Sequence, residues 1–334
     1  MLSAVILHAT LVILGLCGLY FGAELLIRGA VNIASRLGIP ALIIGLTIIA
    51  LGTSAPEIVV SLISAVQGNP TVAVSNVIGS NILNIALVAA LLAVVSPMII
   101  NRSVITHYLP VMLFSYLVLI LLTYTVFTSG FITLTRTHGF ILLILLISYI
   151  AFAYRRRKHQ PVSIDSPPLS VSVVTVDAPA KFWTVNILLL VAGSFLLGFG
   201  SDWLVRGAVW LAEEVFLVSQ RVIGITVVAF ATSLPELITS LVSYVKKEMD
   251  ISIGNIIGSN IFNTFGVLGV TASFVPISFY ESGIIIDYLI MVIIGLCLFI
   301  PLLFTPRFTR LHGILLLIGL FVYMWLLVSD KVGV

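Results

Sequence analysis

Residues 44–64 read IGLTIIALGTSAPEIVVSLIS, and residues 223–243 read IGITVVAFATSLPELITSLVS. Aligned so that Glu57 meets Glu236, the two stretches are identical at 11 of 21 positions. In the same alignment, NVIGSNILN (76–84) matches NIIGSNIFN (255–263) at 7 of 9 positions. Chance likeness between apolar stretches would pair Leu with Ile, whereas these stretches also pair Gly, Thr, Ser, Pro, Glu and Asn. The chain therefore contains an internal duplication.

The composition predicts an integral membrane protein. Of its 334 residues, 60% are hydrophobic and 9% are charged, whereas soluble domains carry roughly 25% charged residues. A membrane-spanning helix needs about 20 mainly apolar residues. Ten runs of this kind occur, at residues 4–26, 38–66, 70–97, 105–126, 132–153, 182–204, 217–245, 251–276, 284–303 and 311–329.

The duplication divides these runs into five and five. An odd number of spans makes the second copy enter the membrane from the opposite side, as in transporters built from inverted repeats. We therefore expect an all-α membrane protein with ten transmembrane helices in two inverted five-helix repeats, residues 1–153 and 182–334. The second and seventh runs carry Pro and Glu in the middle, so we expect both helices to be broken at mid-membrane.

Loop charges predict the orientation. With the N-terminus outside, twelve of the sixteen Lys and Arg residues fall in cytoplasmic loops, as the positive-inside rule requires. This places both termini outside the cell membrane and residues 154–181 in the cytoplasm as a linker. The basic run 155–158 in that linker is expected to fix topology by touching anionic lipid.

Glu57 and Glu236 lie near the centres of two apolar runs, at equivalent repeat positions. A charged side chain at the bilayer centre costs about 2.5–3.5 kcal/mol on insertion scales. Two such carboxylates therefore need partners, and a bound cation or a proton can serve.

Hydroxyl residues stand four and three positions before each glutamate, which places their oxygens on the same helix face. They are Thr53 and Ser54 in the first repeat and Thr232 and Ser233 in the second. Pro56 and Pro235 lack a backbone N–H, so we expect free carbonyl oxygens near Gly52 and Ala231.

The Gly-Ser-Asn motifs supply a second set of oxygens. Serine and asparagine lie four residues apart and share a face in each motif, as Ser80 with Asn84 and Ser259 with Asn263. For the other motif asparagines, interhelical hydrogen bonds are the favoured role. These are Asn76, Asn81, Asn255 and Asn260.

The candidate ligands are all oxygens, without His or Cys. Such sites suit Ca²⁺, Na⁺ or Mg²⁺ rather than zinc or copper. Mg²⁺ keeps several waters, and the charge of two carboxylates equals that of one Ca²⁺, so Ca²⁺ is favoured. Local ion pairs are expected for two acids near helix ends, Glu24 with Arg28 and Asp202 with Arg206.

The paired motifs GTSAPE (52–57) with GSNILN (79–84), and ATSLPE (231–236) with GSNIFN (258–263), resemble the alpha-repeats of the calcium/cation antiporter superfamily. The resemblance is to its prokaryotic sodium/calcium exchanger branch and spans nearly the whole chain. It implies exchange of several Na⁺ for one Ca²⁺ by alternating access at a shared two-glutamate site. Neutral Asn263 stands where potassium-dependent relatives carry an acid, which argues against potassium co-transport.

The resemblance also implies ligands. Glu57 and Glu236, with the backbone carbonyls of Thr53 and Thr232, would bind calcium. One flanking sodium site would use the Ala50 carbonyl, Ser54, Glu57 and Ser80, and the other the Ala229 carbonyl, Ser233, Glu236 and Ser259. Asn84 and Asn263 would lie beside the central site.

Other functions stay open at this point. A proton-coupled antiporter of Ca²⁺ or another divalent cation is the main alternative. A channel is disfavoured by the paired broken-helix repeats, and an enzyme by the lack of a nucleophile–base pair or a metal–histidine cluster. We expect no prosthetic group, no nucleic-acid partner and no obligate protein partner, so that a monomer suffices.

Overall fold

A computed structural model of the chain describes residues 2–123, 131–156, 179–214, 220–280 and 284–330. Eight helices in this part are long and apolar enough to cross a membrane, and a bent pair of helices adds a ninth span. The multi-pass helical membrane protein is therefore confirmed, while the number of ten spans stays a prediction. The predicted 154–181 linker lies mostly outside the described residues, between Arg156 and Pro179.

The chain forms two compact units, and each draws on both sequence halves. The first comprises Met1–Ala55 and Arg157–Asn255. Its helices are α1 (Leu2–Leu37), α2 (Ala41–Ile44), the π-helical turn η1 (Gly45–Ile49), α3 (Ala50–Thr53), α10 (Pro179–Glu214), α11 (Gln220–Val245) and the start of α12 (Met249–Ile261).

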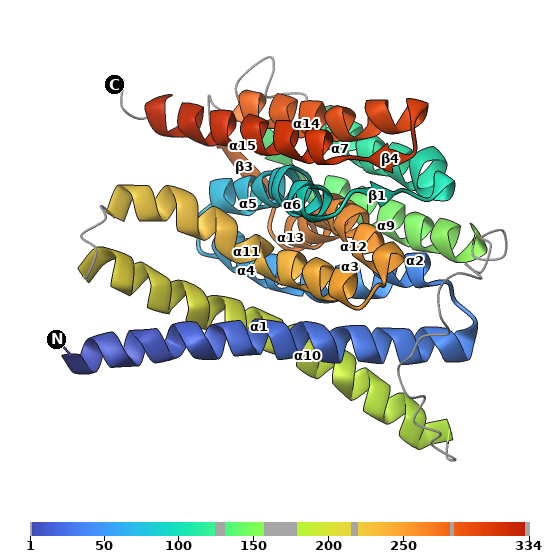
Figure 1. The fold of residues 1–334 in the computed structure, drawn as a ribbon. Coiled ribbons are helices and arrows are strands. Elements are labelled where there is room, and N and C mark those ends of the chain that lie inside the picture. Colours follow the sequence, from blue (N-terminus) through green and yellow to red (C-terminus); the bar gives the residue numbers. More distant parts are fainter. Residues whose placement is uncertain (1, 124–130, 157–178, 215–219, 281–283, 331–334) are drawn as a thin grey trace. The chain divides into compact units, whose positions relative to one another are not determined.

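In the first unit, α1 and α10 cross as two long helices (Figure 1) and pack through glycines. A Cβ added at Gly15 would lie 2.5 Å from the backbone nitrogen of Leu204, and one at Gly29 would lie 2.8 Å from the carbonyl oxygen of Asn186. Because residue numbers rise on α1 as they fall on α10, the helices are antiparallel. Only glycine permits so close a backbone approach.

The contacts between α1 and α10 are reciprocal. In the alignment of GAELLIRGA (22–30) with GSDWLVRGA (200–208), Gly193 is the counterpart of Gly15, and Leu26 is the counterpart of Leu204. A Cβ at Gly193 would lie 2.6 Å from the backbone nitrogen of Leu26, just as one at Gly15 would meet Leu204. Such reciprocity is what a two-fold axis between equivalent elements produces.

The two proline-containing helices differ in continuity, because the first is broken and the second is not. In the first repeat α3 ends at Thr53, Ser54 has a ψ of 2°, and α4 (Ala55–Val66) begins at the next residue, so the predicted break is confirmed. In the second repeat α11 continues through Pro235. The predicted break in the seventh helix is therefore wrong.

A neighbouring helix explains the continuity of α11. Pro235 cannot donate to the carbonyl of Ala231, four residues before it. The hydroxyl of Ser201, on α10, donates to that carbonyl instead. The first-repeat counterpart of Ser201 is Ala23, which has no hydroxyl to offer. The carbonyl predicted to be free near Ala231 is thus satisfied within the protein.

The second unit comprises Pro56–Arg156 and Ile256–Val334. Its helices are α4, α5 (Pro70–Leu83), η2 (Asn84–Ala89), α6 (Ala90–Val95), η3 (Val104–Tyr108), α7 (Leu109–Leu122), α9 (Arg136–Arg156), the rest of α12, η5 (Phe262–Val267), α13 (Leu268–Phe274), α14 (Ile284–Phe304) and α15 (Arg310–Asp330). Its short strands are β1 (Met98–Ile99), β2 (Phe131–Leu134), β3 (Ile277–Tyr280) and β4 (Arg307–Phe308).

These strands, which the sequence did not predict, form two antiparallel pairs. β1 pairs with β4, and β2 pairs with β3. β1 and β3 are repeat counterparts, since Met98 meets Ile277 in the alignment that pairs Glu57 with Glu236. Each pair therefore joins a loop of one repeat to a loop of the other, again reciprocally.

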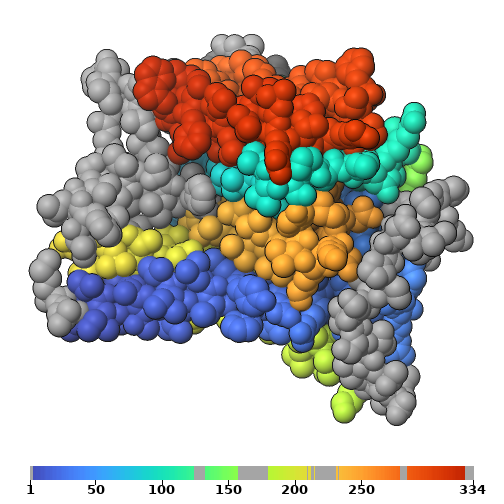
Figure 2. Space-filling model, viewed as in Figure 1, coloured from blue at the N-terminus to red at the C-terminus, as the bar shows by residue number. Residues whose placement is uncertain are grey.

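The outer helices present apolar side chains to their surroundings. On α15, which appears red in Figure 2, Phe321 is 72% exposed and Trp325 is 67% exposed. On α1, shown in blue, Ile13 is 61% exposed. Large apolar side chains at such exposure fit a lipid-facing surface.

Candidate functional site

In the first unit the site is built around Glu236, on α11. Its side chain is fully buried, and its Oε1 accepts a hydrogen bond of 3.2 Å from the hydroxyl of Ser54. Ser54 is the residue at which the first proline-containing helix breaks. The structure thus brings a hydroxyl of the first repeat to the carboxylate of the second, whereas the sequence paired Ser54 with Glu57.

Thr53, beside Ser54, is held by an asparagine of α12. Its hydroxyl lies 3.2 Å from Oδ1 of Asn255 and 3.3 Å from the carbonyl oxygen of Ala50. The Ala50 carbonyl also accepts the backbone N–H of Ser54 at 3.0 Å. Three predicted ligand positions, Ala50, Thr53 and Ser54, are therefore tightly linked at the end of α3.

Ser233 lies on α11, one turn before Glu236, and is buried. Its hydroxyl has no hydrogen-bond partner within the part of the chain that the structure describes. Ala229 and Thr232 belong to the same helix, but their side chains lie outside the described residues. Ser233 is therefore one of the second-repeat hydroxyls that could bind a ligand.

The second unit contains the other predicted ligand residues, and their side chains are buried. Glu57, Asn84, Ser259 and Asn263 are fully buried, and Ser80 is 1% exposed. Each asparagine lies within or at the start of a π-helical turn, η2 or η5. Such turns occur often at functional sites.

The side chains of Asn84 and Asn263 are buried polar groups without a hydrogen-bond partner among the described residues. In the described residues neither the amide nitrogen nor the amide oxygen of either side chain has a hydrogen-bond partner. Leaving a buried polar group unsatisfied costs about 1–3 kcal/mol. Water or a cation beside these amides would remove that cost.

The remaining motif asparagines make interhelical hydrogen bonds, as expected. Asn81 donates to Thr264 at 3.1 Å, and Asn260 accepts from the Tyr116 hydroxyl at 2.7 Å. Asn76 donates to Ser61 at 3.1 Å.

The two serines that accept hydrogen bonds from Asn76 and Asn255 were not singled out from the sequence. Ser61 and Ser240 follow Glu57 and Glu236 by four residues in their respective repeats. That spacing alone would have placed them on the glutamate face of the helix.

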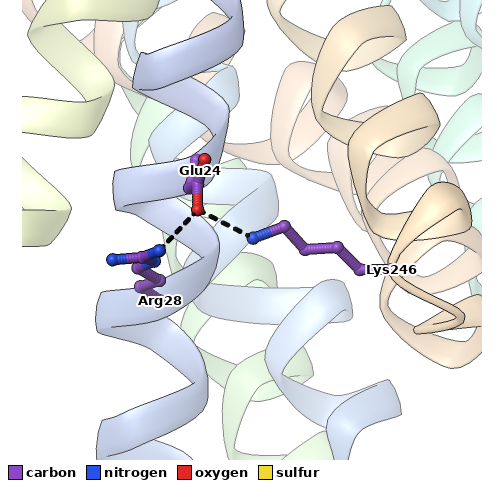
Figure 3. Close-up of polar contacts among 3 residues, drawn as sticks. All are labelled: Glu24, Arg28 and Lys246. Carbon is purple, nitrogen blue, oxygen red and sulfur yellow. Dashed lines mark hydrogen bonds and ion pairs between the residues drawn. The ribbon is translucent and has the colours of Figure 1, made fainter. Parts of the chain in front are cut away.

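The expected ion pairs are confirmed, with one addition, but Glu24 and Asp202 lie within the long helices α1 and α10 and not at helix ends. Arg28 lies 2.7 Å from Glu24, and Arg206 lies 2.7 Å from Asp202. Lys246, at the end of α11, also reaches Glu24 at 3.2 Å (Figure 3). Glu24 and Asp202 thus lie in ion pairs, as expected for them.

Comparisons with known proteins give matches along most of the chain. The sequence profile described as sodium/calcium exchanger protein matches residues 7–155 and 185–329. A protein named CaxA from Alkalimonas amylolytica is 37% identical over 322 residues, covering 96% of this chain and 98% of the relative. The sodium/calcium exchanger MaX1 of Methanosarcina acetivorans is 28% identical, covering 92% of this chain and 94% of its own length. A solved structure of the sodium-calcium exchanger NCX_Mj superimposes with a TM-score of 0.76 at 29% identity, covering 97% of this chain and 99% of that one.

Proposed function

Because the chain belongs to the sodium/calcium exchanger protein family, we propose that it exchanges Na⁺ for Ca²⁺ across the cell membrane by alternating access. The observation that carries this proposal is the pair of fully buried carboxylates, Glu57 and Glu236, at equivalent repeat positions. Buried charges need compensation, and cations recognised by oxygen ligands supply it.

The proposed calcium ligands are both glutamates and the backbone carbonyls of Thr53 and Thr232. The sodium ligands are the Ala50 carbonyl, Ser54 and Ser80 with Glu57, and the Ala229 carbonyl, Ser233 and Ser259 with Glu236. Asn84 and Asn263 complete the central site. The Ser54 bond to Glu236 is compatible with this assignment, because a hydroxyl that donates its hydrogen keeps lone pairs for a cation.

Charge explains the antiport. Two carboxylates carry −2, which one Ca²⁺ neutralises and which Na⁺ ions also neutralise. An uncompensated charge at mid-membrane is costly, so the empty carrier reorients slowly and the loaded carrier reorients readily. Each ion therefore crosses only when the other returns.

The reorientation rests on ten helices in two inverted repeats, residues 1–153 and 182–334, joined by a cytoplasmic linker. The reciprocal glycine contacts of α1 with α10 and the reciprocal strand pairs favour this symmetry. Both termini face the outside in this proposal, because that orientation leaves most Lys and Arg residues inside.

The test uses the full chain in proteoliposomes with radioactive calcium. An outward Na⁺ gradient should drive calcium uptake, and collapsing it should stop uptake. Uptake that ignores Na⁺ but follows a pH gradient would instead establish the proton-coupled alternative. Calcium leakage without any counter-ion would establish a channel.

A further inference from the structure

Asn255 connects three structural elements of the first unit. It lies on α12 and is fully buried. Its Oδ1 accepts from the Thr53 hydroxyl of α3 at 3.2 Å, and its Nδ2 donates to the Ser240 hydroxyl of α11 at 3.1 Å. Nδ2 also lies 3.5 Å from the carbonyl oxygen of Glu236. One amide thus contacts both the end of α3 and the helical turn that carries Glu236.

This arrangement uses both ends of the amide. Thr53 needs an acceptor, whereas the Ser240 oxygen and the Glu236 carbonyl need a donor, and an asparagine side chain supplies both. A second bond runs alongside, from Ser54 to the Glu236 carboxylate. Thr53, the last residue of α3, and Ser54, which follows it, are therefore fixed against one turn of α11.

The asparagine–serine bond recurs in the other repeat. Asn76 and Ser61, the counterparts of Asn255 and Ser240, are bonded at the same distance of 3.1 Å. Because this hydrogen bond recurs at equivalent positions, we infer that it has a role in each repeat beyond holding two helices in contact.

We propose that Asn255 is a positioning residue of the cation site, which fixes the Thr53 carbonyl and Glu236 at the spacing that calcium requires. The inference rests on the proposed function. Ca²⁺ takes six to eight oxygens at about 2.3–2.6 Å, so a shift of α3 against α11 removes ligands. Loss of a residue that orients ligands costs about 10–100-fold in metal affinity.

The experiment measures calcium affinity of the detergent-solubilised full chain by calorimetry, with thermal unfolding in parallel. Asn255→Leu should weaken calcium binding about 10-fold or more, and Ser240→Ala should weaken it several-fold. Asn186→Leu is the matched control. Asn186 is also a buried asparagine of the first unit, bonded to Asn32 and the Phe182 carbonyl, and its loss should lower stability without changing calcium affinity.

A double-mutant cycle separates positioning from packing. Thr53→Val keeps the backbone carbonyl and removes only the hydroxyl held by Asn255. If Asn255 acts through Thr53, the double variant should lose far less affinity than the two single losses combined. Additive losses, or an Asn255→Leu protein that binds calcium like wild type, would overturn the inference.

Two further outcomes are informative. If Asn255→Leu does not fold, a folded Ser240→Ala or Thr53→Val protein with unchanged calcium affinity overturns the inference, and weakened affinity supports it. If the wild-type protein itself binds no calcium, the proposed function fails, which is a different result from a wild type that binds and variants that match it.

Discussion

Gly68 and Lys247, which are counterparts in the two repeats, occupy the same left-handed position after α4 and α11, with φ angles of 81° and 62°. The hydrogen bonds around them also match. The backbone N–H of Asn69 donates to the Ser64 carbonyl at 2.8 Å, and the backbone N–H of Glu248 donates to the Ser243 carbonyl at 2.9 Å. Both helices thus end in a Schellman motif, but only the first has the glycine that this motif favours.

Replacing Lys247 by glycine should stabilise the protein. A left-handed conformation costs an L-residue roughly 1–2 kcal/mol, and glycine avoids this cost. Glycine also loses more backbone entropy on folding, which cancels about half of the gain in stability. We expect a higher thermal midpoint for Lys247→Gly in detergent. Lys247→Ala removes the charge but keeps the strained conformation, so a gain as large as that of the glycine variant would contradict this explanation.

The Ser201 hydroxyl should support the continuity of α11. Without it, the Ala231 carbonyl loses its donor, since Pro235 offers none. Interhelical hydrogen bonds in membranes contribute about 0.6–1.7 kcal/mol. Ser201→Ala should therefore lower the thermal midpoint and speed hydrogen exchange in α11, whereas Ser201→Thr keeps a hydroxyl and should restore much of the protection. Equal exchange in the wild type and Ser201→Ala would show that the bond is dispensable.

The sequence predicts features that depend on residue type and spacing, but it does not predict features that depend on contacts between helices. The repeat, the proline positions and the buried glutamates follow from residue type and spacing, and a break in the second helix was predicted correctly. The seventh helix was predicted wrongly because its continuity depends on Ser201, a residue of another helix. The contact of Lys246 with Glu24 was missed for the same reason, since helix packing is not encoded in local spacing.

The glycine contacts between α1 and α10 should tolerate no side chain. A Cβ at Gly200 would lie 2.7 Å from the backbone nitrogen of Leu19. Gly200→Ala should cost about 1–3 kcal/mol, as overpacking does. At Gly319 on α15 a Cβ would meet nothing within 4 Å, so Gly319→Ala should be neutral or should gain up to about 1 kcal/mol of helix propensity. Thermal midpoints check both, and a Gly200→Ala protein as stable as the control would contradict the packing.

The ion pairs Glu24–Lys246 and Asp202–Arg206 should differ in strength. The Glu24 side chain is 18% exposed and Lys246 is 31% exposed, whereas Asp202 and Arg206 are 44% and 71% exposed. Exposed pairs contribute about 0–1 kcal/mol. A cycle of Glu24→Gln with Lys246→Gln should reach the upper part of that range and fall with added salt. The matched cycle of Asp202→Asn with Arg206→Gln should give close to zero, and the reverse order would refute the burial argument.

In the proposed function, Glu57 and Glu236 are two halves of one calcium site. Calorimetric titration of the full chain with Ca²⁺ in Na⁺-free buffer measures this most directly, with Glu57→Gln and Glu236→Gln as variants. We expect one Ca²⁺ per wild-type chain, displaced by Na⁺, and no calcium binding in either variant. Two Ca²⁺ per wild-type chain, with one retained in each variant, would mean two independent sites and would contradict it.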